Sequence, residues 1–168
     1  MTQPYGRIEW SAAEIAEHER TPRPRFSGLA HISLPVRDLE EAKRFYIETL
    51  GGRLILNLPG FAEVIVAGVV FGLSERRGVP QPPDTEFPHI ALSIASDDVL
   101  PMKRWLEDHG VATHDVWTRR GEEALMYFKD PSGNLLEMYC AHYGAADRLP
   151  KATGMESPVD LRALSYHW

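Results

Sequence analysis

The sequence predicts an α+β fold made of two βαβββ modules, which form an open, curled mixed β-sheet with the helices outside it. The first observation is an internal repeat, since the segment that begins at Leu29 shares its features with the one that begins at Phe87. The second is a change of hydrophobic pattern within each copy, from a β-rich run to a helical run and then to short β-rich runs. A strand, a helix and three strands are therefore expected twice.

The first copy predicts a helix with recognisable ends. The β-rich run LAHISLPV is followed by Asp38, which suits an N-cap, and apolar residues then recur at helical spacing up to Gly51, which suits a C-cap. Beyond this glycine, β-branched and aromatic residues predict three strands, RLILNL, FAEVIVAG and VVFGLSER.

The second copy follows the same order. The run PHIALSI precedes Asp97, which we expect to cap a helix that holds Pro101 in its first turn and ends at Gly110. Three more strands are predicted, VATHDVW, EALMYFKD and LLEMYCAHY. A DPSGN turn at 130–134 separates the last two, and its residue types suit a structural turn.

The repeat indicates one domain with two extensions. Residues 27–143 form the domain, with modules at 27–78 and 86–143 that are separated by the proline-rich linker GVPQPPDTEFP. The N-terminal extension, 1–26, contains SAAEIAEHER, which predicts a short capped helix. The C-terminal tail, 144–168, ends in aromatic residues and is expected to pack against the domain or a neighbouring subunit.

Composition excludes several classes of protein. The 168 residues carry a net charge of −6, and no dense run of Lys and Arg offers a nucleic-acid surface. Apolar stretches are too short for a membrane helix, and the N-terminus lacks a signal-peptide pattern, so we expect a cytoplasmic protein without a membrane partner. With a single cysteine, any metal must use nitrogen and oxygen ligands.

Three residues predict a metal site. His31 and His89 occupy equivalent positions on the first strand of each copy, and a pseudo-twofold relation between the modules could turn both towards one cavity. Glu137 lies in the apolar run LLEMYC, where an unpaired carboxylate would carry a large desolvation penalty. Taken singly, a His at a strand end is usually a surface or hydrogen-bonded core residue and a Glu on a strand usually faces solvent, but their places in the repeat favour one divalent metal.

Two imidazoles and one carboxylate leave metal positions open for water, oxygen or substrate. Such a set suits Fe(II), Mn(II), Ni(II) or Zn(II) and is more typical of a catalytic than of a structural site.

Several other side chains are candidates for catalysis or substrate binding. Tyr127 could orient a substrate oxygen or donate a proton, or could simply be a core residue. His114, beside Asp115, could be a general base, although a surface pair is the simpler interpretation. Arg119 and Arg120 could bind an anionic group of the substrate or be solvated loop residues.

The tryptophans of the second half are expected to be packing groups. Trp117 is the best candidate among them for the wall of a pocket.

Three stretches together resemble the vicinal oxygen chelate superfamily, which includes glyoxalase I, fosfomycin-resistance transferases, extradiol dioxygenases and bleomycin-binding proteins. They are GLAHISLPVRDLEEAKRFYIETLGG, FPHIALSI and YFKDPSGNLLEMY. The resemblance spans residues 27–143 and places His31, His89 and Glu137 where metal-dependent members carry ligands. It also places Ser33 and Tyr127 where fosfomycin transferases carry hydroxyls near the metal.

The leading expectation from this resemblance is an extradiol-type dioxygenase that acts on a small, catechol-like substrate with Fe(II). Extradiol enzymes carry a Tyr ten residues before the metal Glu, and Tyr127 and Glu137 have that spacing. Glyoxalase I takes a fourth ligand from a strand that here, as VAGVVFGLS, offers only apolar and small residues. In the loop that fosfomycin enzymes use for the phosphonate, Trp117 replaces a lysine and Glu122 and Glu123 add negative charge.

Two alternatives remain open. The first is a glyoxalase-like or fosfomycin-transferase-like lyase, isomerase or thiol transferase with a non-redox metal such as Mn(II), Ni(II) or Zn(II). The second is a metal-free protein that binds a small molecule between its modules. In each case the partner is a small-molecule substrate or ligand, and we expect a homodimer.

Overall fold

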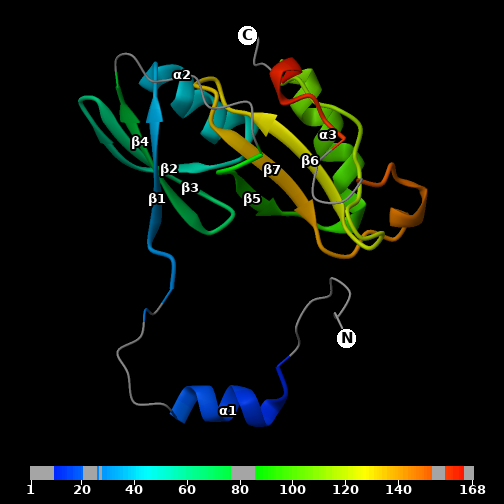
Figure 1. Ribbon diagram of the computed structural model, residues 1–168. Coiled ribbons are helices and arrows are strands. Elements are labelled where there is room, and N and C mark those ends of the chain that lie inside the picture. The colour runs from blue at the N-terminus through cyan, green and yellow to red at the C-terminus, as the bar shows by residue number, and fades with distance from the viewer. Residues whose placement is uncertain (1–9, 21–25, 27, 77–85, 153–157, 165–168) are drawn as a thin grey trace.

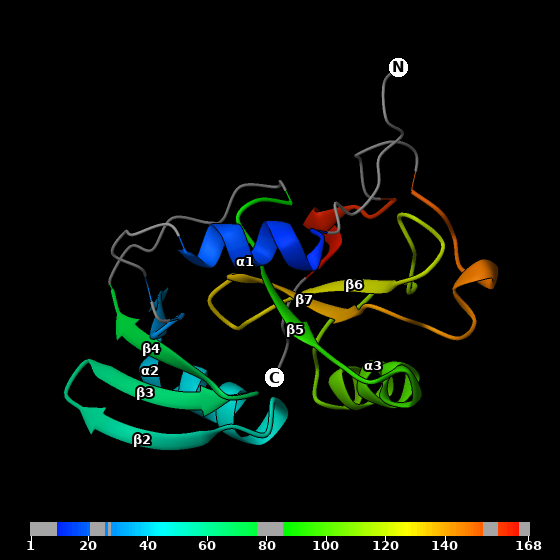
Figure 2. The ribbon, with the colours of Figure 1, turned by 90° about the horizontal axis from the view of Figure 1, so that it is seen from below.

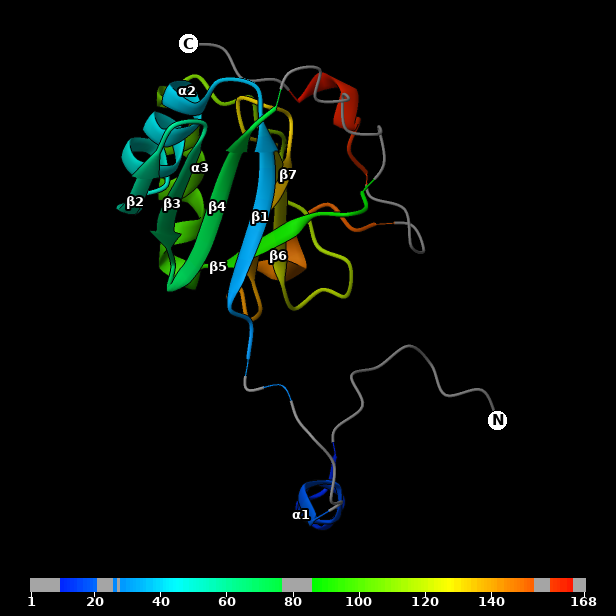
Figure 3. The ribbon, with the colours of Figure 1, turned by 90° about the vertical axis from the view of Figure 1, so that its left-hand side faces the viewer.

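The computed structural model describes residues 10–20, 26, 28–76, 86–152 and 158–164, which form two β-sheets with helices packed against them (Figure 1). In this part of the chain, no helix is long and apolar enough to cross a membrane. Helix α1 (Ala12–Arg20) is the predicted capped helix, since the Ser11 and Glu14 side chains and backbones hydrogen bond reciprocally. It buries none of its residues and lies away from both sheets (Figure 3).

The first module has the predicted order of elements. Asp38 caps the helix by accepting a hydrogen bond from the Glu41 amide at 2.9 Å, and Gly51 follows the helix with a φ of +69°, as a C-cap glycine should. The sheet order is β1-β4-β3-β2, in which β1 and β4 are parallel and the other pairs are antiparallel. The elements are β1 (His31–Val36), α2 (Leu39–Arg44), the π-helical turn η1 (Phe45–Thr49), β2 (Arg53–Leu58), β3 (Phe61–Val66) and β4 (Val69–Glu75).

The second module forms a separate sheet of order β5-β7-β6, with α3 on one of its faces (Figure 2). Strand β5 is parallel to β7, and β6 is antiparallel to it. The predicted single curled sheet is therefore divided into two sheets within one chain. The elements are β5 (Ile90–Ser93), the 3₁₀ turn η2 (Ser96–Asp98), α3 (Val99–Asp108), β6 (Ala124–Lys129) and β7 (Leu135–Cys140).

Two local predictions in the second module are wrong. Asp97 does not cap α3, because it lies within η2 and Asp98 takes the N-cap position without a side-chain hydrogen bond. The run VATHDVW is not a strand and has only isolated bridge residues at its ends, Val111 and Trp117, the latter paired with Leu125. The physical reason is that the His114 side chain, not a backbone carbonyl, accepts the hydrogen bond of the Tyr127 amide at the edge of β6.

One hydrophobic core joins the two modules. Helices α2 and α3 contribute to it together with alternate residues of the strands, such as Val64 on β3 and Met126 on β6. The next residue along a strand faces the other way, so each sheet has one face in the shared core and one face turned from it. The predicted ligands His31 and Glu137 both lie on the faces turned from the core, because their neighbours Ile32 and Leu136 pack within it.

The DPSGN turn connects the modules, as a structural turn should. The buried Asp130 carboxylate accepts hydrogen bonds from the amides of Ser132 and Asn134 and from the Tyr46 hydroxyl at 3.1 Å. Tyr46 belongs to the first module, and Arg37 of that module donates from its amide to the Ser132 hydroxyl at 3.0 Å. Asp130 therefore fixes the turn and ties it to the neighbouring helix.

Replacing this carboxylate should weaken the whole domain. We expect Asp130→Ala to lower the free energy of unfolding by roughly 2–4 kcal/mol, because it leaves several buried donors unpaired. Urea denaturation measures the change, and the exposed Asp108→Ala serves as the control, with an expected change within about 0.5 kcal/mol. Equal midpoints for the two variants would contradict this role.

Candidate metal site

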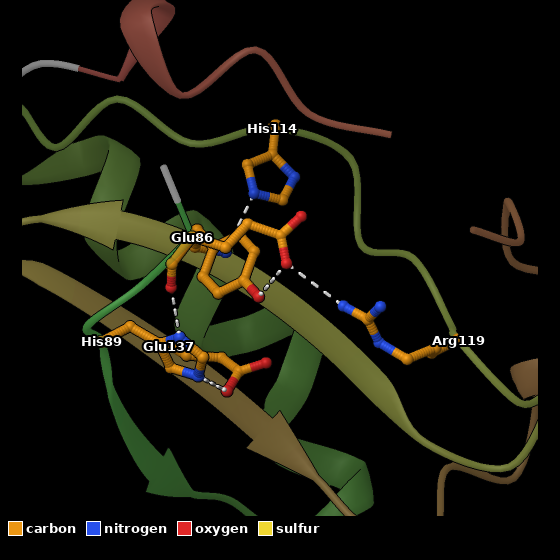
Figure 4. A network of polar contacts seen from close by, with 6 residues as sticks. Glu86, His89, His114, Arg119 and Glu137 are labelled. Carbon is orange, nitrogen blue, oxygen red and sulfur yellow. Dashed lines mark hydrogen bonds and ion pairs between the residues drawn. The ribbon is translucent and has the colours of Figure 1, made fainter. Parts of the chain in front are cut away.

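Two of the three predicted ligands, His89 and Glu137, are in contact on the face of the second sheet that is turned from the core (Figure 4). Parallel pairing sets Ala91 of β5 beside Glu137, so His89, two residues earlier, projects from the same face. The His89 Nε2 atom lies 3.1 Å from Oε2 of Glu137, and Glu137 is only 5% exposed. An imidazole nitrogen and a buried carboxylate thus converge on one point.

The second ring nitrogen of His89 fixes its orientation. Nδ1 lies 2.6 Å from the backbone carbonyl oxygen of Glu86, and because a carbonyl only accepts, Nδ1 carries a proton. Nε2 is then the nitrogen presented to Glu137. Burial raises the pKa of Glu137, and His89 opposes this rise. A divalent cation bound between Nε2 and the carboxylate would supply positive charge to this buried group.

The third predicted ligand lies elsewhere in the same chain. His31 starts β1 of the first sheet and is exposed, as is Ser33, which follows it on the same face. The described ranges contain no group of three His, Cys, Asp or Glu side chains placed to hold a metal ion within one chain. The structure therefore brings two of the three ligands together and leaves His31 on an open face.

Tyr127 lies beside the His89 and Glu137 pair. It is opposite Glu137 in the antiparallel pairing of β6 and β7, so both side chains share one face. Its ring meets the His89 ring edge-on at 5.3 Å between centroids, and its hydroxyl donates to Oε2 of Glu86 at 3.3 Å. Burial, followed by the charges of Glu137 and Glu86, raises the pKa of the phenol far above its usual value. Tyr127 is therefore a hydrogen-bond donor in this site.

Both candidate arginines are paired with carboxylates of the chain itself. Arg119 Nη2 donates to Oε2 of Glu86 at 3.2 Å, and its guanidinium lies 5.2 Å from the ring centre of Trp117. Arg120 Nε lies 3.4 Å from a carboxylate oxygen of the buried Glu123. The Glu123 side chain also accepts hydrogen bonds from the backbone amides of both arginines, and these bonds stabilise the conformation of the loop before β6.

Trp117 and the C-terminal tail cover the part of this face next to Tyr127. Trp117 is fully buried, and segment 158–164 packs over it, as expected for the tail. The terminal aromatic residues on which that expectation was based lie outside the described residues. Lys129 Nζ on β6 donates to the carbonyl oxygen of Leu161 in this segment at 2.9 Å. The buried apolar cluster at this place consists of Trp117, Leu125, Tyr127, Leu135, Leu161 and Leu164.

His114 has both ring nitrogens in use. Nε2 accepts a hydrogen bond from the Tyr127 amide at 2.8 Å, and Nδ1 donates to the carbonyl oxygen of Asp115 at 2.7 Å. Burial lowers the pKa of the ring, which keeps it neutral. In this arrangement no lone pair of His114 is available to remove a proton from a substrate. The geometry favours a structural role, in which His114 holds β6 in place.

This role makes a prediction about stability and pH. Removing the acceptor of the Tyr127 amide by His114→Leu should lower the free energy of unfolding by about 1–2 kcal/mol at pH 7.5. Because the pKa of His114 is lowered in the folded state, its contribution is present above the usual value of 6.5 and is lost as the pH falls through the lowered pKa.

Urea midpoints of both proteins at pH 7.5 and 5.5 measure this effect. The difference between wild type and His114→Leu should shrink at the lower pH, and a difference that grows would contradict the structural role.

Glu86 is a central residue of the site that the sequence analysis missed. Its carbonyl oxygen accepts from His89, and its carboxylate accepts from both Tyr127 and Arg119 (Figure 4). It lies in the proline-rich segment that the sequence analysis treats as a linker. Its position three residues before His89 is the one signal that could have drawn attention to it.

Comparison with known proteins identifies the family. Residues 28–138 match the family model of the Glyoxalase/Bleomycin resistance protein/Dioxygenase superfamily. The chain belongs to this superfamily, in agreement with the resemblance carried by the sequence motifs.

Similar proteins include two transferases. The glutathione transferase FosA of Serratia marcescens is 30% identical over 120 residues, which are 70% of this chain and 83% of that protein. The metallothiol transferase FosB of Staphylococcus saprophyticus is 24% identical over 111 residues, 65% of this chain and 74% of that protein.

A solved structure of the fosfomycin resistance protein FosX from Listeria monocytogenes also matches. It contains Mn(II) and 1S,2S-dihydroxypropylphosphonic acid, shares 25% identity, and superposes with a TM-score of 0.61 over 73% of this chain and 96% of that chain. These three relatives are transferases and a fosfomycin resistance protein, not dioxygenases. The comparisons therefore favour the transferase-like alternative over the extradiol interpretation.

Proposed function

We propose that this protein is a metal-dependent enzyme that adds a nucleophile, a thiol or water, to a small oxygenated electrophile such as an epoxide. The observation that carries the proposal is the contact between the half-buried His89 and the buried Glu137, on a sheet face whose equivalent position in the first module holds His31. The names of the relatives support it, since FosA and FosB are thiol transferases and the FosX structure contains a phosphonic acid with two hydroxyl groups.

The side chains fit a divalent metal. Two imidazole nitrogens and one carboxylate oxygen form a donor set that suits Mn(II), Zn(II), Ni(II) or Fe(II) and leaves positions open. A carboxylate that is buried and has a raised pKa gains most from a nearby cation. The Mn(II) in the FosX structure makes Mn(II) the first metal to test, and the names of these relatives do not favour Fe(II).

The complete site requires a second copy of the chain. Strands β1 and β5 are edge strands of their sheets. Each has exposed residues on the face turned from the core, which are His31 and Ser33 on β1 and Ala91 and Ser93 on β5. If β1 of one copy meets β5 of its partner, the two sheets continue into the open, curled sheet that the sequence predicts. His31 of one copy then approaches His89 and Glu137 of the other, and a twofold axis generates two such sites.

A bound divalent metal would act as a Lewis acid that polarises the electrophile and stabilises the developing oxyanion. The chain's own residues provide the surroundings. His89 is held by Glu86 in the tautomer that presents Nε2, and Tyr127 offers a phenolic hydrogen bond to a substrate oxygen. Ser33, on the face of His31, would add a second hydroxyl, and Trp117 with the tail excludes water from the sheet beside Tyr127.

Metal analysis with an activity panel tests the proposal. Protein purified without a metal-affinity tag or chelator should bind one Mn(II) per chain by calorimetry, and thiol or water should be consumed with epoxides, fosfomycin among them, only when metal is present. His89→Ala should lose both properties, and the exposed His142→Ala is the matched control. Oxygen uptake with catechols would instead favour a dioxygenase, and ligand binding without metal would favour a binding protein.

A further inference from the structure

The carboxylate of Glu86 lies next to the predicted metal ligands His89 and Glu137. There it pairs with the positive charge of Arg119, which a substrate anion would otherwise contact. One oxygen, Oε2, accepts both from Arg119 at 3.2 Å and from the Tyr127 hydroxyl at 3.3 Å. The Glu86 side chain is only 13% exposed, so little water screens its charge. Figure 4 shows the Glu86 carboxylate joined to Arg119 by a dashed line, with His89 and Glu137 close by.

We propose that Glu86 is an internal counter-ion of Arg119 and that it determines which substrates the site selects. The preferred electrophile is uncharged and carries a hydroxyl or N–H donor at the end that meets Glu86. A phosphonate or phosphate at that end is disfavoured. The inference rests on the proposed function and specifies its substrate class. A doubly charged group that approaches Tyr127 and Arg119 must separate the Arg119–Glu86 ion pair and then lie beside the Glu86 carboxylate. An uncharged donor can hydrogen bond to that carboxylate without separating the pair.

Two further cations of this module, Arg120 and Lys129, are also engaged. Arg120 contacts Glu123, whose carboxylate is bound by two backbone amides and is fixed in the loop. Lys129 donates to the backbone carbonyl of Leu161. Neither is positioned to replace Arg119 as the partner of a substrate anion, so Glu86 determines how much positive charge this end of the site presents.

The rest of the wall supports the same class of substrate. Trp117 lies beneath the Arg119 guanidinium, and the apolar cluster that includes Leu125 and Leu161 continues from it. Such surroundings strengthen the repulsion between like charges because they exclude water.

The test compares anion binding by wild type, Glu86→Gln and Glu86→Asp, with inorganic phosphate as the probe and with the exposed Glu122→Gln as the control. Removing the charge of Glu86 releases Arg119 from this ion pair, so Glu86→Gln should bind phosphate about tenfold more tightly by calorimetry. Glu86→Asp and Glu122→Gln should bind phosphate as wild type does. In the double variant Glu86→Gln/Arg119→Gln, the gain should disappear.

Kinetics provide a second measurement. For matched epoxides that differ only in a hydroxyl or a phosphonate group, Glu86→Gln should shift the ratio of kcat/KM values about tenfold towards the phosphonate. Equal phosphate affinity in folded Glu86→Gln and wild type would overturn the proposal, as would a gain that survives the loss of Arg119.

The measurement is made with and without Mn(II), so that two failures can be told apart. If wild type binds no metal, the proposed function fails, while phosphate binding to the metal-free proteins still tests the counter-ion. If metal binds but Glu86→Gln gains no affinity for phosphate, only the inference about substrate charge fails. Thermal unfolding confirms that each variant is folded, and Glu86→Asp, which keeps the charge, controls for a change of shape.

Discussion

Mixing the His31→Ala and Glu137→Ala variants should restore metal binding that neither variant has alone. If each site combines His31 of one subunit with His89 and Glu137 of the other, a dimer of one chain of each variant has one site with both substitutions and one with neither. Random exchange of subunits should therefore restore about a quarter of the sites. Calorimetry with Mn(II), before and after exchange of the mixed subunits, measures this fraction.

The matched control mixes His89→Ala with Glu137→Ala. Both residues belong to the same half of the site and contact each other at 3.1 Å in one chain. Each of the two sites in a mixed dimer then carries one substitution, so this pair should recover no binding. Recovery by this pair as well would contradict the assignment of His89 and Glu137 to one half.

The decisive comparison uses chains that carry both His31→Ala and Glu137→Ala, mixed with wild type. In these mixed dimers each site combines one altered half with one normal half, so neither site should bind metal if the sites are shared between subunits. If each site belonged to one chain, the wild-type subunit would keep its own site. Full binding by the wild-type half of the mixture would thus contradict the shared site.

Glu137→Gln should affect metal binding and stability in opposite directions. Loss of a carboxylate ligand should weaken Mn(II) binding by at least about 100-fold. The metal-free protein should keep its free energy of unfolding or gain up to about 1 kcal/mol, because a neutral amide avoids the desolvation that raises the pKa of the Glu137 carboxyl. Calorimetry and urea denaturation give the two values.

The exposed Glu122→Gln is the control for this substitution, and it should change neither quantity. A variant that binds Mn(II) as wild type does would remove Glu137 from the ligand set. A loss of several kcal/mol in the metal-free form would mean that Glu137 stabilises the fold in the absence of metal.

Local patterns predicted the parts of this structure that depend on local physics. The helix between Asp38 and Gly51 and the turn at Asp130 follow from caps and turn residues that act within a few positions. The strands β6 and β7 on either side of that turn were predicted as well, and in the structure they pair antiparallel, with Tyr127 opposite Glu137. Each of these needs only neighbours in the sequence, and a single sequence shows them.

The remaining features depend on contacts between distant residues. The strand expected at VATHDVW is absent because the His114 side chain reaches the Tyr127 amide. Glu86 belongs to the site because Arg119, far along the chain, pairs with it. The repeat predicted which residues of the two modules are equivalent. It does not reveal whether the two modules that form one site belong to one chain or to two. His31 was therefore expected near His89 and Glu137, whichever chain supplies it.

Residues 158–164 cover part of the sheet beside Tyr127, and they lie far along the chain from the predicted metal ligands. The family match ends at residue 138, whereas Leu161 and Leu164 pack beside Tyr127 from beyond it. The groups that can hold a metal and the groups that shape the adjoining wall are thus encoded in different stretches. If the proposed function is right, insertions or exchanges in the tail would change the surroundings of Tyr127 while the ligand strands stay intact.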